Sequence, residues 1–455
     1  MEELESLSEV IVKYSRRPMY ILIAILLVSL TVITVLAVLY GISMNPHTKY
    51  LLIIDCGLSS CTFSLFEYTD WYGRSNAWVH QRSHYTISSG TSSFGDNPTA
   101  DAEAILQETK AVITKGVPSN LQKDTRVFFG AAAGFRMLRK TNPQKAQRLM
   151  VAVKNALADL PPKGVVVSMT EDVRVVSGAE QGFYAWFAAN YLMGNFGKEY
   201  SEFRYRPLLT LGALNLGDVS TQMTFVPLAE EALPKSRMKA MAFGYSYNLY
   251  SQSHLCYGVV TIRARYLAHL TQGSDLQKPV ASPCHQSGLS MEVASDDIFQ
   301  APCITSTEED IMGPSIPKPS GAPAKIAFRG DYNAARCGQA IESIFADGSF
   351  ANVYRPRLRG DFAAIDKLRE IVTSFKKTNH SAKVTRTEFV TAIDNFCLPP
   401  EEQATSEEKC LQGWIVKGLL EAYGFKNDSD WSTIIFLGNQ FGQATWFLRR
   451  CSTST

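Results

Sequence analysis

Residues 49–66 of the chain are KYLLIIDCGLSSCTFSLF, and residues 208–225 are LLTLGALNLGDVSTQMTF. In both stretches an apolar run leads into a short polar loop with a glycine and is followed by a second run, which predicts two strands joined by a tight loop. Aligning Asp55 with Asn215 gives the pattern Asp/Asn-x-Gly-x-x-Ser in both loops. Because the pattern occurs twice, about 160 residues apart, the sequence predicts two duplicated lobes with one glycine loop each.

The segments around these loops alternate between strand and helix patterns. Residues 125–139 and 173–187 each predict a strand, a loop of small or polar residues and the start of a helix. Residues 365–375 and 415–423 have helical spacing, and residues 431–438 predict a late strand. This alternation favours an α/β fold.

Size and composition exclude several classes of protein. The chain has 455 residues, about three times a typical domain of ~150 residues, so two lobes or domains are expected. Its 45 Lys and Arg against 43 Asp and Glu leave a net charge of +2, which gives no broad basic surface and argues against a nucleic-acid partner. An apolar content of 45% is enough for a large core and excludes a wholly disordered chain.

One segment departs from this globular composition. Residues 20–42 contain no Asp, Glu, Lys or Arg, and as a helix they would span about 34 Å, enough to cross a lipid bilayer. Lys13, Arg16 and Arg17 lie on the N-terminal flank, so the positive-inside rule places residues 1–19 in the cytosol. We therefore predict a single-pass type II protein whose main part is extracellular or lumenal, at the plasma membrane, Golgi or ER. The alternative is a buried core helix.

This topology gives the nine cysteines a role, because disulfides form in oxidising compartments. Six cysteines in the second half allow fifteen connectivities, and sequence alone does not choose between them. These six are Cys256, Cys284, Cys303, Cys337, Cys397 and Cys410. We expect Cys56 and Cys61 not to pair, because a bridge between them would distort the glycine loop. Cys451 stays unassigned, and the sequons at Asn379 and Asn427 fit a glycosylated exterior.

Two glycine loops that face each other across a cleft can hold a polyphosphate through backbone N–H groups and bind a divalent cation through its waters. Hydrolysis further requires a carboxylate that activates water, and Glu180 lies at a strand-loop-helix junction where such a base could project. Ser177 and Glu180 also have the spacing of a capping box, in which Glu180 only accepts the N-cap amide. Spacing alone favours the cap.

The motifs, taken in order over residues 49–448, resemble the ectonucleoside triphosphate diphosphohydrolases, the apyrase family of the actin-like and sugar-kinase-like superfamily. The resemblance rests on five segments: 55–59, 130–139, 177–194, 212–222 and 438–446. It implies two RNase H-like lobes with a central cleft. We place residues 48–167 and 433–455 in the first lobe and residues 168–432 in the second.

The resemblance also implies roles for particular residues. Glu180 matches the catalytic base, and Ser220 and Gln222 match residues that place the attacking water. The positions on the side of the metal, which would be Ca²⁺ or Mg²⁺, are Asp55, Asn215 and Trp446. The nucleotide-binding positions are Gly57, Ser59, Gly217, Asp218, Val219 and, for stacking on the base, Tyr423. The family's disulfides would pair Cys256 with Cys303, Cys284 with Cys337, and Cys397 with Cys410.

Four positions depart from the family pattern. Asn215 replaces an aspartate, which removes a carboxylate from the metal side. Asp218 replaces a glycine beside the expected phosphates, and its charge would repel them by several kcal/mol at ~4 Å and intermediate dielectric. Leu58 and Ala132 stand where hydroxyl side chains are usual. These changes predict weakened polyphosphate binding.

Three hypotheses about function follow from these residues. The first is a membrane-anchored hydrolase, an apyrase, that removes the terminal phosphate of nucleoside tri- or diphosphates. The second is a weakened family member that serves as a nucleotide-binding or interaction protein. The third is another enzyme of the superfamily, such as a kinase, which an extracellular location without an obvious ATP supply makes unfavourable. The oligomeric state is not predicted.

Overall fold

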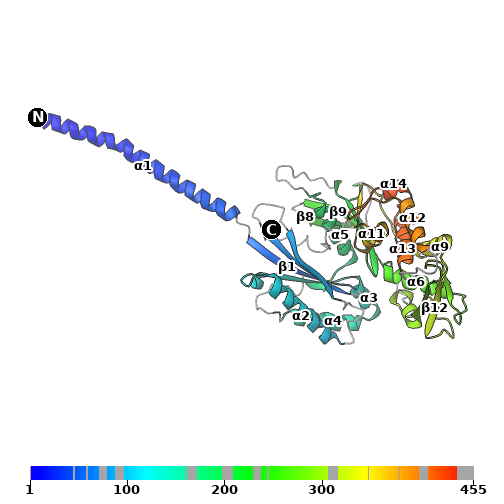
Figure 1. The fold of residues 1–455 in the computed structure, drawn as a ribbon. Coiled ribbons are helices and arrows are strands. Elements are labelled where there is room, and N and C mark those ends of the chain that lie inside the picture. The colour runs from blue at the N-terminus through cyan, green and yellow to red at the C-terminus, as the bar shows by residue number, and fades with distance from the viewer. Residues whose placement is uncertain are drawn as a thin grey trace.

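The computed structural model describes residues 2–44, 47–57, 60–70, 79–87, 97–158, 160, 172–196, 209–228, 237–242, 245–305, 316–346, 348–378, 380–398 and 408–437. A long N-terminal helix projects from a body that contains two main sheets and their covering helices (Figure 1). The body holds the candidate site, so its two sheets are described first.

The first sheet has five strands in the order β3-β2-β1-β4-β5. They are β1 (His47–Cys56), β2 (Cys61–Asp70), β3 (Val79–Ile87), β4 (Arg126–Ala131) and β5 (Val173–Val175). The first three strands pair antiparallel, whereas β4 and β5 continue parallel to β1. The helices of this lobe are α2 (Pro98–Gly116), the short η1 (Gln122–Asp124), α3 (Ala133–Thr141) and α4 (Pro143–Ala158).

β1 is apolar at successive positions because both of its faces are covered. Leu52 and Ile54 pack in a core with residues of α2 and α4, whereas Leu51 and Ile53 face the opposite way into a second core. A strand buried on both sides loses the alternation of a half-exposed strand. The edge strand β3, by contrast, alternates between partly buried and exposed residues.

The second sheet repeats the first. Its order is β14-β13-β6-β7-β9-β8. The strands are β6 (Gly212–Leu216), β7 (Ser220–Phe225), β8 (Arg237–Ala242), β9 (Tyr245–Leu255), β13 (Phe362–Ile365) and β14 (Ile434–Phe436). If β6, β7, β9, β13 and β14 take the places of β1 to β5, the order and the strand directions agree, and β8 is an added edge strand. The predicted α/β fold with duplicated lobes is confirmed.

Two predicted lobe boundaries shift. β5 hydrogen bonds to β4 and so belongs to the first sheet, although it lies beyond the predicted boundary at residue 167. β14 pairs with β13 in the second sheet, although residues from 433 onward had been placed in the first lobe. In both cases a three-residue strand is too short to show its partner in the sequence.

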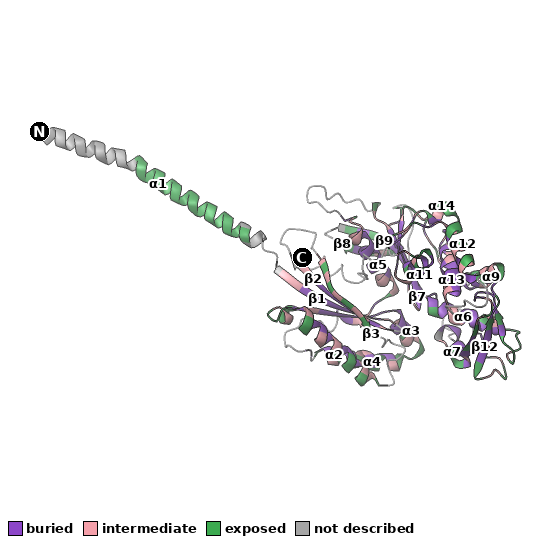
Figure 2. Ribbon diagram, in the orientation of Figure 1, coloured by how far each residue is buried: buried purple, intermediate pink, exposed green. Residues whose placement is uncertain are grey.

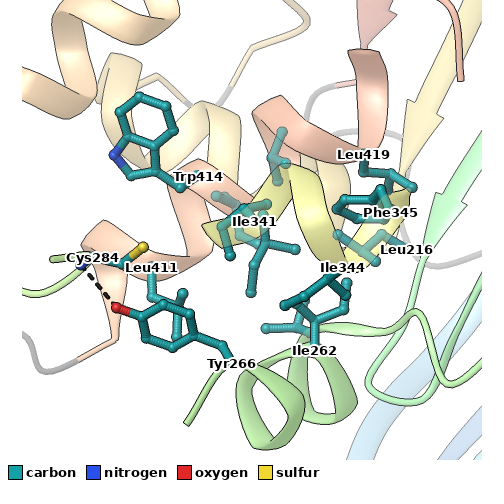
Figure 3. Close-up of a cluster of buried hydrophobic side chains, with 14 of the residues drawn as sticks. Leu216, Ile262, Tyr266, Cys284, Ile341, Ile344, Phe345, Leu411, Trp414 and Leu419 are labelled. Atoms are coloured by element: carbon teal, nitrogen blue, oxygen red, sulfur yellow. Dashed lines mark hydrogen bonds between the residues drawn. The ribbon is translucent and has the colours of Figure 1, made fainter. Parts of the chain in front are cut away.

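Helices and a small sheet cover the outer side of the second lobe. The sheet contains β10 (Val280–Ser282), β11 (Ser290–Ala294) and β12 (Lys325–Gly330). The helices are α6 (Val259–Thr271), α7 (Ser295–Phe299), α8 (Pro302–Thr305), α9 (Ala334–Phe345), α10 (Gly348–Ala351), α11 (Asp366–Lys376), α12 (Arg386–Cys397), α13 (Lys409–Ala422) and α14 (Asp428–Trp431). Figure 3 shows Ile262, Ile341 and Trp414 of three of these helices in one core, where Tyr266 accepts a hydrogen bond from the Cys284 N–H at 3.0 Å.

Three disulfides lie in this lobe. They join Cys256 to Cys303, Cys284 to Cys337, and Cys397 to Cys410. Each is a pair that the family resemblance implied, so this part of the cysteine prediction is confirmed.

One helix, α5 (Gly178–Leu192), lies between the two sheets. Residues 182–190 are all buried, and Phe183 and Trp186 share a core with Leu51 of the first sheet and Leu249 of the second. A helix enclosed in this way has no polar face. The aromatic run after Glu180 therefore reflects the position of α5 inside the body.

The N-terminal helix α1 (Glu2–Met44) carries the predicted membrane segment. Its stretch Pro18–Leu39 has a mean hydropathy of 3.1, is long and apolar enough to cross a membrane, and is not buried against the rest of the protein. Figure 2 shows this stretch exposed and projecting from the body. A buried core helix, the alternative drawn from sequence, is therefore excluded.

Candidate active site

A cavity of about 290 Å³ lies where the glycine loops of the two lobes meet. Its lining includes Asp55, Gly57 and Ser60 of the first loop, Asn215, Gly217, Asp218, Val219 and Ser220 of the second loop, and Ala132, Gln181, Asp366, Lys367 and Glu370. The duplicated hairpins thus face each other across one space, as the sequence predicted. Ser59 and Trp446 lie outside the described residues, as does Leu58.

The two loops have the same turn. The Gly57 N–H donates to the Ser60 carbonyl at 2.9 Å, and the Gly217 N–H donates to the Ser220 carbonyl at 2.9 Å. Asp55 and Asn215 hold equivalent places at the ends of β1 and β6. The alignment of the two loops in the sequence therefore corresponds to equivalent backbone positions.

The first loop also contains a disulfide, which corrects one prediction. Cys56 and Cys61 are bonded to each other, although we had expected a bridge here to distort the loop. The two residues lie directly opposite each other on β1 and β2 with their Cα atoms 4.1 Å apart. The equivalent residues of the second hairpin, Leu216 and Thr221, also lie opposite each other, so the bridge joins positions that the turn brings together by itself.

The second loop is oriented by the N-terminus of α6. The Val259 and Val260 N–H groups donate to the carbonyls of Gly217 and Asp218, both at 3.0 Å. Because a trans peptide points its N–H opposite to its carbonyl, the N–H groups of Asp218 and Val219 face away from α6. Backbone N–H groups aligned in this way form an anion-binding surface. Gly258 is required here, since a Cβ would lie 2.3 Å from the Val219 nitrogen.

A polar network connects the second loop to the first lobe. Gln222 donates to the hydroxyls of Ser220 at 2.7 Å and Ser253 at 3.0 Å. Arg136, from α3, donates to Ser220 at 3.3 Å and to Gln181 at 2.7 Å. Burial lowers the pKa of Arg136 to about 10, so it stays cationic at neutral pH. With two donors on its oxygen, the Ser220 hydroxyl retains its proton for a ligand in the cavity.

Gln222 lies one layer behind the cavity. Its side chain is buried, and its oxygen accepts a hydrogen bond from Asn215 at 3.0 Å. Both of its N–H donors are used by Ser220 and Ser253. Gln222 therefore positions Ser220, and Ser220 is the member of this pair that lines the cavity.

Glu180 takes part in a capping box. Its backbone N–H donates to the Ser177 hydroxyl at 3.2 Å, and its carboxylate accepts from the Ser177 N–H at 3.0 Å. Arg174 of β5 also contacts the carboxylate, with a nitrogen on each oxygen at 2.9 Å. Burial raises the pKa of Glu180, but Arg174 and Ser177 outweigh it, so the pKa lies below its ordinary value. Glu180 is not among the described residues that line the cavity, whereas its neighbour Gln181 is.

The charge added at Asp218 has a partner that sequence reasoning missed. Lys367, the second residue of α11, lies with its Nζ 3.0 Å from Asp218 Oδ1. The predicted repulsion between Asp218 and a phosphate is thus partly offset within the protein itself. In the sequence, Lys367 is recognisable only as a lysine in the first turn of a helix, and this does not reveal which loop that turn approaches.

Asp366 is a second residue that the sequence analysis missed. It precedes Lys367, has a φ of +50°, and lies beside Leu216 in an isolated parallel bridge. Burial first and the charge of Glu370 second raise its pKa to about 6, against an opposing hydrogen bond from Asn215. The lining therefore regains next to Asn215 the carboxylate that the second loop has lost.

Tyr423 is separate from this cavity. Its ring is 1% exposed and packs against His254 and Phe350, and its hydroxyl donates to Thr221 at 3.1 Å. It borders a different cavity of about 480 Å³, together with Arg355. In this arrangement its ring face is covered by neighbours.

The two equivalent hairpins that border the cavity agree with the family to which the sequence is similar. The sequence profile of the GDA1/CD39 (nucleoside phosphatase) family matches residues 42–448. The chain belongs to this family. The resemblance to apyrase-type enzymes is thereby confirmed, and with it the class of enzyme.

Individual members of the family cover most of the chain. Ectonucleoside triphosphate diphosphohydrolase 3 of Homo sapiens is 28% identical over 448 residues, which are 92% of this chain and 81% of that protein. Ectonucleoside triphosphate diphosphohydrolase 1 of Mus musculus is 27% identical over 446 residues, 92% of this chain and 84% of that protein. The solved structure of nucleoside triphosphate hydrolases from Neospora caninum has a TM-score of 0.63 at 13% identity, over 86% of this chain and 89% of that one, which shows a shared fold.

Proposed function

We propose that the protein is a membrane-anchored hydrolase that removes the terminal phosphate from nucleoside tri- or diphosphates. The observation that carries the proposal is the meeting of two equivalent glycine loops in one cavity, in a chain of the nucleoside phosphatase family. The backbone N–H groups of Asp218 and Val219 suit the phosphate chain. The names of the relatives, which include triphosphate diphosphohydrolases, suggest the substrate class.

In the proposed reaction a water attacks the terminal phosphorus in line with the leaving oxygen, and the phosphoanhydride bond breaks. Glu180 takes the proton of the attacking water. To do so, its carboxylate must first replace a hydrogen bond from Arg174 with one from that water. The Ser220 hydroxyl donates a hydrogen bond to that water or to a phosphate oxygen, and Gln222 and Arg136 hold Ser220 in place. The products are orthophosphate and a nucleotide with one phosphate fewer.

The residues present fit a divalent cation held through water. Within the described part of the chain, no three His, Cys, Asp or Glu side chains are grouped to ligate a metal directly. Asp55, Asp366 and Asn215 offer oxygen atoms, and the buried Asn215 Oδ1 has no hydrogen-bond partner among the described residues. Oxygen donors suit Ca²⁺ or Mg²⁺. Such a cation would supply charge neutralisation of the phosphate oxygens.

The anchor is part of the proposal. α1 would cross the bilayer, with residues 1–19 cytosolic and the catalytic body extracellular or lumenal. The flanking Lys13, Arg16 and Arg17 support this orientation through the positive-inside rule. The membrane itself, whether plasma membrane, Golgi or ER, is part of what a localisation experiment would decide.

The test is phosphate release by the full-length protein in detergent. ATP, ADP, UDP and GDP are each assayed with Ca²⁺, with Mg²⁺ and with EDTA. The proposal expects cation-dependent release that EDTA abolishes. Asn215 and the engagement of Glu180 by Arg174 favour a second candidate, a nucleotide-binding protein with little turnover. Nucleotide binding by calorimetry without phosphate release would establish that candidate instead.

A further inference from the structure

Lys367 differs in charge from the other ionisable groups around the cavity. Among the lining residues that the structure describes, it is the one Lys or Arg, whereas Asp55, Asp218, Asp366 and Glu370 are all acidic. A polyphosphate that enters this space meets four carboxylates. Like charges at short range repel each other strongly inside a protein, so a positive side chain at the lining favours binding in addition to the cation.

The position of Lys367 favours an anion next to it. It lies in the first turn of α11, where the aligned peptide dipoles favour negative charge and disfavour a lysine. The Asp218 carboxylate, 3.0 Å from the Lys367 Nζ, supplies that negative charge. The lysine side chain is 42% exposed, so its ammonium group can reach a ligand in the cavity without unfolding the helix.

An independent observation indicates that the cavity takes a ligand. Asn215, which shares the lining with Lys367, is 4% exposed, and its Oδ1 has no hydrogen-bond partner within the described residues. A buried polar atom without a partner is costly. Its presence beside the N–H groups of the second loop points to a site that is completed by bound substrate and cation.

We propose that Lys367 binds the polyphosphate chain of the nucleotide, and that Asp218 holds the lysine at the cavity wall until the substrate arrives. The proposal rests on the proposed function for its substrate class. It gives Asp218 and Lys367 one shared role: the carboxylate at residue 218 is tolerated beside the phosphates because it positions the lysine ammonium that binds them.

The competing role for Lys367 is neutralisation of Asp218 alone. A double-mutant cycle separates the two roles. If Lys367 only cancels the charge of Asp218, Lys367→Met has no effect once Asp218 has become Asn. If Lys367 contacts phosphate, Lys367→Met weakens binding in both backgrounds.

The experiment measures the dissociation constant of a methylene-bridged nucleoside triphosphate, which cannot be hydrolysed at its terminal linkage, by calorimetry with Mg²⁺. The proteins are full-length wild type, Lys367→Met, Lys367→Arg, Asp218→Asn and the Asp218→Asn/Lys367→Met double variant. We expect Lys367→Met to weaken binding about tenfold, the effect of one charged hydrogen bond, in both backgrounds. Lys367→Arg should retain most of the affinity.

A matched control and a separate readout complete the design. Lys376→Met removes the same charge at the other end of α11, where Lys376 pairs with Glu388, and should leave affinity unchanged. Equal affinity of the Asp218→Asn single and double variants would overturn the proposal, as would a wild type that does not bind the analogue. Binding of the analogue without release of phosphate from nucleotides would instead refute the proposed hydrolysis. The affinities of the variants would still decide whether Lys367 binds phosphate.

Discussion

Glu180 forms the capping box, which is one of the two roles that the sequence left open, and its role as the catalytic base stays a prediction. It lies in the first turn of α5, and the next residue, Gln181, lines the cavity. If Glu180 is the base, Glu180→Ala should lower phosphate release by ~10²–10⁴-fold. Loss of the cap alone costs ~1 kcal/mol. Parallel measurements of turnover and melting temperature separate the two effects.

Glu388 provides a matched control for this prediction. It forms the same capping box with Thr385 at the start of α12. Glu388→Ala should therefore lower the melting temperature by a similar amount and leave turnover intact. If Glu180→Ala behaves like Glu388→Ala, Glu180 is a cap and the base must be sought elsewhere.

Asp366 should make stability depend on pH. Burial, followed by the charge of Glu370, raises its pKa to about 6. The folded protein therefore holds this proton more tightly than the unfolded chain, so the stabilisation is present at low pH and is lost as pH rises through about 6. Asp366→Asn cannot ionise and also tolerates the positive φ. Its melting temperature should gain on that of the wild type between pH 4 and pH 7; parallel curves would contradict the prediction.

For single residues, the sequence predicted those that belong to a local motif and missed the contacts between residues of different motifs. Asp55, Asn215, Gly217 and Ser220 were predicted because the loop pattern is local and repeated. Lys367 was missed because its contact with the second loop spans about 150 residues and depends on how α11 packs. No periodicity within α11 contains that information.

The two hairpins can be compared as elements, since the second forms the same turn without a bridge. Replacing Cys56 and Cys61 together by Ala should therefore keep the loop and its nucleotide affinity. It should cost ~2 kcal/mol, because the bridge closes a short loop in the unfolded chain. Denaturant unfolding and calorimetry measure the two quantities.

The Cys397–Cys410 bridge of the second lobe, which closes a longer loop of the chain, is the comparison. Removing it should cost somewhat more stability and leave nucleotide affinity unchanged. If the Cys56 and Cys61 double variant instead loses nucleotide binding at unchanged stability, the bridge holds the first loop in a shape that the turn does not reach alone.

Strands and helices with strong local patterns were predictable, and the enclosed or very short ones were not. The apolar runs of β1 and β6 and the spacing of α11 and α13 carry their own signal. β5 and β14 are too short to do so, and the location of α5 between the sheets follows from packing. The pairing of Cys56 with Cys61 was predicted wrongly because loop strain was weighed without the register of the strands.

The orientation of the whole molecule in the membrane can be tested at Asn427. Its side-chain oxygen caps α14 by accepting from the Asp430 N–H at 3.0 Å, which leaves its amide nitrogen for a glycan at an exposed position. We expect cells to glycosylate Asn427, and Asn427→Asp, which keeps the cap, to reduce the mobility shift produced by a glycosidase by the share of one glycan. Cytosolic proteolysis of the body in intact microsomes would show the reversed topology.

The place of α5 has a mechanical consequence for the molecule. Arg174 belongs to β5 of the first sheet, whereas Glu180 lies in the first turn of α5, which packs against β6, β7 and β9 of the second sheet. Their ion pair therefore joins the two sheets, in addition to the packed side chains around α5 and the hydrogen bonds of Arg136 to the second lobe. A rotation of one sheet against the other would change the distance between Arg174 and Glu180 to the extent that α5 moved with the second sheet. Such a rotation would therefore alter the ion pair that helps to hold the pKa of Glu180 below its ordinary value.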